Sequence, residues 1–266
     1  MTPTSARTLA TRLAMVAAGM LLLVARPSAA QVLSKPVDQS IVPFSTLYGT
    51  VGRMNADPTG INSHFSRPDL PGGTGFSALS NDAYSIGVGG YTPIARILLG
   101  FDWNYADFGY ETSPLGKTNR AETSNLMVTA GLPLYTTWRF TFYPYVGIGG
   151  GAMRVTLKSR DGGPTVPLDR SPTFDEIILS PGSESQVIGK YFMVQPGLGF
   201  DYLMLADNPT SHFGVTLGIR FATIITPNRT PWTYRGHEVF GGPTFQPSGG
   251  TLRLIVGIGG FKLAKE

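Results

Sequence analysis

Residues 97–108, which read ILLGFDWNYADF, decide the fold of this chain. In an extended chain successive side chains point to opposite faces. One face then carries the large side chains Ile97, Leu99, Phe101, Trp103 and Tyr105. The other face carries Gly100, Asp102, Asn104 and Ala106. The pattern predicts a β-strand with one apolar face and one small or polar face.

The same alternation recurs along the chain and predicts eight strands. They are expected over residues 44–53, 84–91, 97–108, 125–132, 140–156, 192–202, 213–221 and 252–259. The segments between them alternate in length: long (54–81), short, medium (109–120), short, long (157–187), short and long (226–250). Outer-membrane barrels have an even number of antiparallel strands, short periplasmic turns and long external loops. We therefore expect an all-β, eight-stranded antiparallel up-and-down transmembrane β-barrel with both ends in the periplasm.

Alternation alone also fits a secreted, lipocalin-like barrel whose apolar face points inward. The second face decides between the two, because a soluble barrel needs Lys and Glu outside. Here that face holds Gly, Thr, Ser and Asn, and charged residues make up only 14% of the chain. Small side chains fit the narrow interior of an eight-stranded barrel. The apolar face is therefore expected to meet lipid.

The beginning of the chain predicts export. Residues 1–30 hold Arg7 and Arg12, an apolar run of roughly 12 residues and small residues at Ser28 and Ala30, which is typical of a signal peptide and too short for a spanning helix. We expect a periplasmic lead-in at 31–43 and the barrel domain at 44–266. Removing the signal takes away three arginines and no acid, so the net charge falls from +4 to about +1 and indicates no nucleic-acid partner. Without cysteine, neither disulfides nor thiolate metal sites can form.

Four charged side chains fall on the small, inward face: Asp102, Asp201, Arg220 and Arg253. Buried charges must be paired or hydrated. Because Arg220 and Arg253 lie on neighbouring strands, we expect Asp102 to be their partner. Such a polar network more often fills the lumen and stabilises the barrel than conducts solutes or catalyses a reaction.

The last long loop combines basic and aromatic residues, among them Arg229, Trp232, Tyr234 and Arg235. This composition suits recognition of a glycan, a lipid headgroup or a protein. It equally suits an aromatic interface belt with snorkelling arginines. No other segment has the spacing of a metal or cofactor site: the glycines of 147–151 lie within a strand, and the acids of 157–187 have no known ligand spacing.

Two strands carry a family resemblance. Residues 143–150 (YPYVGIGG) and 196–202 (PGLGFDY) resemble strand signatures of the small outer-membrane barrels of the OmpA-like and OmpW-like type. The resemblance implies a bacterial outer-membrane location, a monomer surrounded by lipopolysaccharide, insertion by the barrel insertion machinery and loops at the cell surface. Two departures are residues 262–266 after Phe261, where such barrels end on an aromatic residue, and Pro196, which predicts an irregularity in its strand.

Three functions follow as expectations. The first is a structural or surface-recognition role through the extracellular loops, with an extracellular ligand or host surface as partner. The second, implied by OmpW-like barrels, is a narrow, porin-like channel for small hydrophobic molecules. The third is a lipid A-modifying hydrolase, because Ser211–His212 resembles the serine and histidine of outer-membrane lipid A deacylases. The sequence places no carboxylate to orient that imidazole, so we expect no enzyme.

Overall fold

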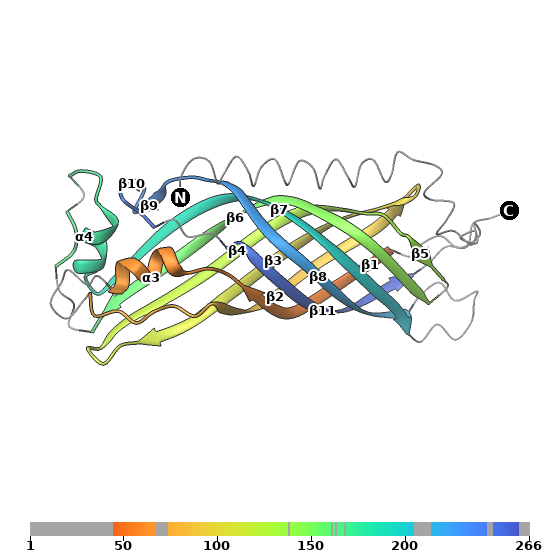
Figure 1. The fold of residues 1–266 in the computed structure, drawn as a ribbon, viewed down its shortest axis with the longest axis horizontal. Coiled ribbons are helices and arrows are strands. Elements are labelled where there is room, and N and C mark those ends of the chain that lie inside the picture. The colour runs from red at the N-terminus through yellow and green to blue at the C-terminus, as the bar shows by residue number, and fades with distance from the viewer. Residues whose placement is uncertain are drawn as a thin grey trace. The chain divides into compact units, whose positions relative to one another are not determined.

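Eight long antiparallel strands form a closed barrel in the computed structural model (Figure 1). They are β1 (Ser45–Asn55), β2 (Asp82–Ile94), β3 (Ile97–Thr112), β4 (Lys117–Gly131), β6 (Phe140–Ser159), β7 (Glu184–Met204), β8 (Gly214–Arg229) and β11 (Gly249–Gly260). Each long strand pairs with the next one along the chain, and β1 also pairs with β11, which closes the cylinder. The predicted eight-stranded up-and-down barrel is confirmed.

The structure describes residues 45–66, 74–137, 139–160, 162, 164–167, 169–204, 214–243 and 247–260. The expected signal peptide, the lead-in, the Ser211–His212 pair and the tail after Phe261 lie outside these ranges. Within them, every helix is too short or too polar to cross a membrane.

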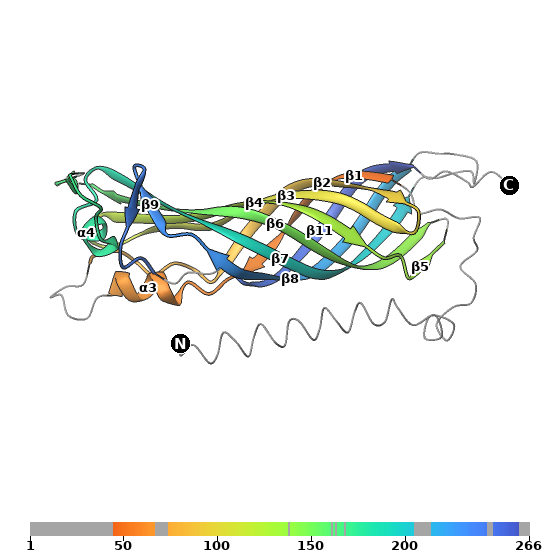
Figure 2. The same cartoon turned by 90° about the horizontal axis from the view of Figure 1, so that it is seen from above.

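The connections at the two ends of the barrel differ. One end carries helix α3 (Thr59–Ser66), helix α4 (Phe174–Leu179) and a hairpin of β9 (Trp232–Tyr234) and β10 (His237–Val239). We call these three elements the cap and this end the cap end; Figures 1 and 2 both show the elements gathered there. The opposite end, the turn end, holds the first residue of β1, the last of β11, the turn at Ala95 and Arg96, and the short strand β5 (Tyr135–Thr136).

An apolar belt surrounds the half of the barrel nearer the turn end. Its members are outward-facing and exposed, and include Leu47, Val51, Ile86, Val88, Leu99, Phe101, Leu126, Val128, Ile148, Leu198, Leu217, Ile219, Leu252, Leu254, Val256 and Ile258. Soluble monomers rarely expose a contiguous apolar surface of this extent, whereas barrels that span a membrane carry such a band. The outward orientation expected for the apolar face is therefore the one observed.

Toward the cap end the outward face of the strands becomes polar and the inward face becomes apolar. On β6 the outward side chains change from Val146 and Ile148 to Arg154 and Lys158. The inward side chains change in the opposite sense, from Tyr143 and Gly147 to Val155 and Leu157, which are both fully buried. The strand thus leaves the apolar belt and continues as the wall of a barrel with its own apolar interior.

Because of this change, several strands extend farther toward the cap end than predicted. Residues 109–120 were expected to be a loop, but β3 continues to Thr112 and β4 begins at Lys117. Likewise, the expected loop 157–187 contains the end of β6, α4 and the beginning of β7. An outward apolar face marks only the part of these strands that lies within the belt, because past the belt the apolar residues point inward.

The cap covers this apolar interior at the cap end. Its helices and hairpin contribute fully or almost fully buried side chains to one cluster with the cap-end halves of the strands: Ile61, Phe65, Phe174, Ile177, Ile178, Trp232 and Tyr234. Pro196, where an irregularity was expected, pairs with Val146 in a continuous β6–β7 ladder. On its other side the β7–β8 ladder has pairs at Val194 and Gly197 but none at Pro196, so the expected irregularity lies between β7 and β8. That ladder also shifts register between Phe192 and Val194.

Candidate functional site

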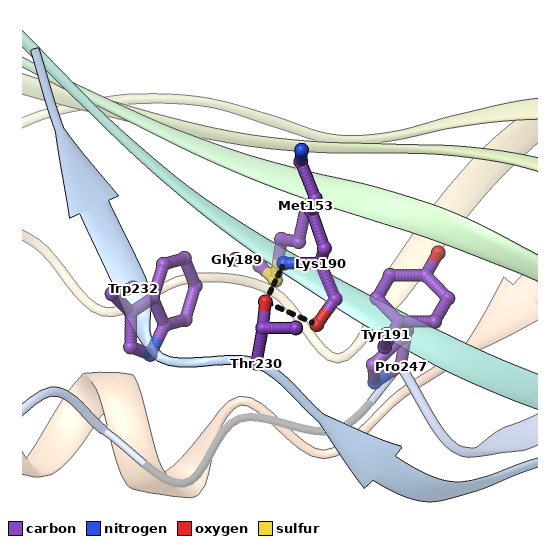
Figure 3. Close-up of a pocket in the computed structure, with 7 residues that line it drawn as sticks. All are labelled: Met153, Gly189, Lys190, Tyr191, Thr230, Trp232 and Pro247. Atoms are coloured by element: carbon purple, nitrogen blue, oxygen red, sulfur yellow. Dashed lines mark hydrogen bonds between the residues drawn. The ribbon is translucent and has the colours of Figure 1, made fainter. Parts of the chain in front are cut away.

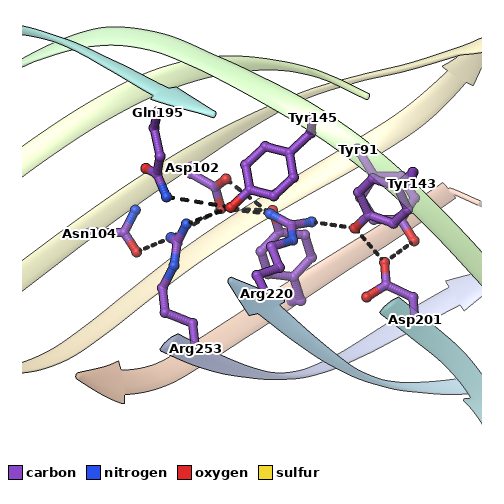
Figure 4. Close-up of polar contacts among 10 residues, drawn as sticks. Tyr91, Asp102, Asn104, Tyr143, Tyr145, Gln195, Asp201, Arg220 and Arg253 are labelled. Atoms are coloured by element: carbon purple, nitrogen blue, oxygen red, sulfur yellow. Dashed lines mark hydrogen bonds and ion pairs between the residues drawn. The ribbon is translucent and has the colours of Figure 1, made fainter. Parts of the chain in front are cut away.

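The lumen inside the apolar belt contains a buried ion-pair network (Figure 4). The Asp102 carboxylate lies 3.0 Å from the Arg220 guanidinium and 3.9 Å from that of Arg253. All three side chains are at least 97% buried. Arg253 also donates a 2.6 Å hydrogen bond to Asn104 Oδ1. Asp102 therefore pairs with both arginines, and its single negative charge offsets one of their two positive charges.

Four tyrosine rings surround the Arg220 guanidinium. The distances from its central carbon to the ring centroids are 4.4 Å for Tyr48, 5.4 Å for Tyr145, 5.8 Å for Tyr91 and 5.9 Å for Tyr143. The Tyr48 hydroxyl donates to Asp102 Oδ1 at 2.7 Å and also contacts Arg220. The cation thus combines a charge pair with favourable contacts to aromatic faces.

Asp201 joins the network through tyrosines. Its Oδ2 accepts hydrogen bonds from the Tyr91 hydroxyl at 2.6 Å and from the Tyr143 hydroxyl at 2.7 Å. Tyr143 in turn accepts one from Arg220 Nη2 at 3.1 Å. The structure therefore brings Asp102, Asp201, Arg220 and Arg253 together. The tyrosines between them were not predicted, although Tyr143 and Tyr145 alternate with outward apolar residues and so fall on the polar face of their strand.

The network fills the barrel at the level of the belt. Its members come from β1, β2, β3, β6, β7, β8 and β11. An eight-stranded barrel is only wide enough for packed side chains. The arrangement therefore ties the strands to one another and leaves the lumen occupied by protein.

Helix α4 holds the cap together. Thr173 and Glu176 form a capping box at its N-terminus, and Arg170 pairs with the Glu176 carboxylate. The hydrogen bonds from Arg170 and from the Thr173 backbone N–H lower the pKa of Glu176 to about 2. Two acids of residues 157–187, a segment whose acids could have suggested a cation site, therefore bind protein groups. Glu176 pairs with Arg170, and the Asp175 carboxylate lies 2.7 Å from His64 Nδ1 of α3.

Trp232 anchors the hairpin to the barrel wall. Its Nε1 donates to the Pro243 carbonyl at 3.0 Å, and its ring lies 5.9 Å from that of Phe174. A Cβ added at Gly189 would come within 3.1 Å of the indole, and one at Gly242 would come closer still. Figure 3 shows Trp232 beside β7, next to a cavity of about 20 Å³ that has room for about one water molecule.

This packing corrects part of the predicted recognition surface. Trp232 is 7% exposed and Tyr234 is fully buried, with its hydroxyl 3.1 Å from Ser185 Oγ. Neither ring is available as a surface platform or as an interface belt, because the hairpin folds back onto β7. Arg235 is exposed, with its guanidinium 5.3 Å from the centroid of the Tyr234 ring. The side chain of Arg229 lies outside the described part of the chain.

Comparisons with known proteins give similarities of fold. No protein-family model and no curated protein matches the sequence. Among solved structures, Ail, the attachment invasion locus protein of Yersinia pestis, in complex with the heparin analogue sucrose octasulfate, has a TM-score of 0.41 and 6% identity over 82% of this chain and 98% of that one. Neisserial surface protein A has a TM-score of 0.40 and 11% identity over 83% and 97%. A major outer membrane protein from Thermus thermophilus has 0.37 and 10% over 82% and 99%. The barrel assignment itself rests on the strand pairing and burial of this chain.

Proposed function

We propose that the chain is an outer-membrane barrel that is closed to solutes and presents its cap at the cell surface for recognition of an extracellular ligand. One observation carries this proposal: the cap end is a folded structure with its own apolar core, while the lumen below it is filled by the Arg220 network. A channel for solutes would need neither feature. Together the two features provide a rigid platform outside the membrane.

The apolar belt supports the membrane location. On β6 the outward side chains are apolar or small from Phe142 to Ala152, and the next outward residue is Arg154. A tilted transmembrane β-strand needs about 9–11 residues, which matches this run. The expected signal peptide would deliver such a chain to the periplasm, where the barrel insertion machinery acts.

The arrangement of the connections supports the orientation. The first residue of β1, Ser45, the last of β11, Gly260, and the turn at Ala95 and Arg96 share one end. In outer-membrane barrels the chain ends and short turns lie in the periplasm. The cap then lies outside the cell, surrounded by lipopolysaccharide at its base.

The outer surface of the cap end offers features for binding. A cleft of about 470 Å³ is lined by Phe65, Phe76, Pro114 and Leu115 together with the serines 66, 77 and 113. Leu115 is 67% exposed, and Phe240 elsewhere in the cap connection is 56% exposed. Apolar side chains exposed beside hydroxyl groups suit a glycan or a protein surface as ligand.

Adhesion and conductance together test the proposal. Cells producing the wild-type chain should bind glycan arrays or epithelial monolayers more strongly than cells carrying Leu115→Ser with Phe240→Ser. Leu134→Ser, which changes an exposed leucine at the turn end, should behave as wild type. Purified wild-type chain should give no steady conductance in planar bilayers. Adhesion equal to that of cells without the chain, or a stable conductance, would contradict the proposal.

The two other expected functions differ in their support. The filled lumen counts against a channel for small hydrophobic molecules. The hydrolase stays a hypothesis, since Ser211 and His212 lie outside the described residues. Deacylation of lipid A by wild type that is lost in Ser211→Ala and His212→Ala would support it.

A further inference from the structure

The change from apolar to charged outward side chains along the strands marks the level at which the barrel wall leaves the lipid. On β6 the outward residue Ala152 is followed, toward the cap end, by Arg154. On the neighbouring strand β7 the outward residue Phe192, which is 44% exposed, is followed in the same direction by Lys190. Ala152 pairs with Lys190 across the two strands. Two cations thus lie directly above the belt on adjacent strands.

Lys190 and Arg154 lie close enough to act on one group. Arg154 pairs with Ile188, so Lys190 is its diagonal neighbour on the outer face. Such neighbours are about 7–8 Å apart at the backbone, well within the reach of two long side chains. Both side chains are exposed to the surroundings of the barrel.

Neighbouring acids leave these two cations incompletely compensated. Asp107 and Glu122 both pair with Arg120, at 2.5 Å and 2.8 Å. The other carboxylate oxygen of Glu122 is 3.7 Å from Arg154. Within the described chain no acid pairs with the Lys190 ammonium. Farther toward the cap end, Lys158 has its own partner, Glu184, at 2.9 Å.

We propose that Arg154 and Lys190 form a binding site for a phosphate group of a lipid in the outer leaflet, such as the phosphorylated sugar of a glycolipid. The site rests on the proposed membrane location and orientation. Its level is that of the lipid headgroups, where a basic residue is attracted to anionic lipid. The guanidinium offers paired donors and the ammonium a compact charge, and both form strong charge-assisted hydrogen bonds with phosphate.

Lipid retention tests the site. The full chain is folded into phosphatidylcholine vesicles that contain diphosphoryl lipid A in both leaflets, extracted into mild detergent and analysed for bound lipid A by mass spectrometry. The double variant Arg154→Gln with Lys190→Gln should retain at least about fivefold less lipid A than wild type. Lys158→Gln, an outward cation on the same strand but with its own acid, should retain the wild-type amount. Dephosphorylated lipid A should be retained poorly by every variant.

Equal retention by wild type and the double variant would overturn the proposal, as would equal retention of the dephosphorylated lipid. Heat-modifiable gel mobility establishes that each variant is folded, and Lys190→Gln alone, with an expected smaller loss, replaces the double variant if that one does not fold. Because both leaflets carry the same lipid, the result does not depend on which end of the barrel faces outward. A failure of the cap orientation is therefore distinguishable from a failure of this site.

Discussion

The Arg220 guanidinium lies 3.0 Å from the Asp102 carboxylate inside a barrel whose outer face is apolar at the same level. The pair sits on β8 and β3, which are not neighbours in the sheet, so it links strands across the lumen. Water cannot easily replace either partner there, and the cost of an unpaired charge would be high. The network thus links strands that are not neighbours and fills the lumen at the level of the belt.

Removing the acid should therefore be costly. Asp102→Ala leaves two buried arginines without the carboxylate that pairs with them directly and should lower the free energy of unfolding by about 3–5 kcal/mol. Urea unfolding in vesicles, followed by tryptophan fluorescence, measures the effect. Asp107→Asn, which breaks the half-exposed pair with Arg120, is the matched control and should cost less than about 1 kcal/mol. Similar costs for the two variants would show that the lumen network is hydrated and loosely held.

A charge on the apolar belt should oppose membrane insertion. Leu217→Arg puts a cation on the lipid-facing side of β8 and should cost about 2–4 kcal/mol near the bilayer midplane. Thr156→Arg introduces the same residue on the outward face of β6, beyond Arg154, and should have little effect. Folding yield in vesicles at graded urea concentrations compares them. If Leu217→Arg folded as well as Thr156→Arg, the belt would not face lipid.

A methyl group added beside the Trp232 indole should destabilise the cap. In Gly242→Ala the added methyl would overlap the indole, so the ring must move and its fluorescence should shift to the red. Overpacking of this kind costs about 1–3 kcal/mol. The measurement uses a chain with Trp103→Phe and Trp138→Phe, in which Trp232 is the one tryptophan left. Gly250→Ala, where an added methyl meets no atom within 4 Å, should leave the spectrum unchanged.

Acid should weaken the cap through Glu176. Its pKa is lowered to about 2, chiefly by Arg170 and then by the Thr173 N–H, against about 4.3 in an unfolded chain. A depressed carboxyl pKa stabilises the folded form above the unfolded value, and this contribution is lost as the pH falls from about 4.3 toward 2. Trp232 fluorescence, sensitive to the contact with Phe174 of α4, should change over this range in wild type. The change should be smaller in Glu176→Gln, and an identical pH profile in the two would contradict the assignment.

The sequence was sufficient for the half of the barrel within the belt. The alternation in residues 97–108 identifies the outward face because lipid demands apolar side chains there, and it isolates Asp102 as a lone charge on the inward face. The pairing of Asp102 with Arg220 and Arg253 could be anticipated from charge alone. The role of the tyrosines could not, since a tyrosine on a strand fits a lumen and a membrane interface equally well.

The cap was harder to predict, because its elements are short and are stabilised by tertiary contacts rather than by periodicity. Two local signals were nevertheless present. Thr173 followed by Glu176 is a capping box, which marks the beginning of α4. Arg235 and Gly236, both with positive φ, form the tight turn of the β9–β10 hairpin. What no local signal shows is that Trp232 and Tyr234 point inward, since this depends on the hairpin packing against β7.

The most direct test of the account is the accessibility of its two ends on intact cells. The chain has no cysteine, so single-cysteine variants give unambiguous labelling. Glu238→Cys places a thiol on exposed β10 of the cap, and Arg96→Cys places one on the exposed turn at the other end. A membrane-impermeant maleimide should label Glu238→Cys on intact cells and Arg96→Cys only after lysis. Labelling of Arg96→Cys on intact cells, with Glu238→Cys protected until lysis, would contradict the proposed orientation and the recognition role of the cap.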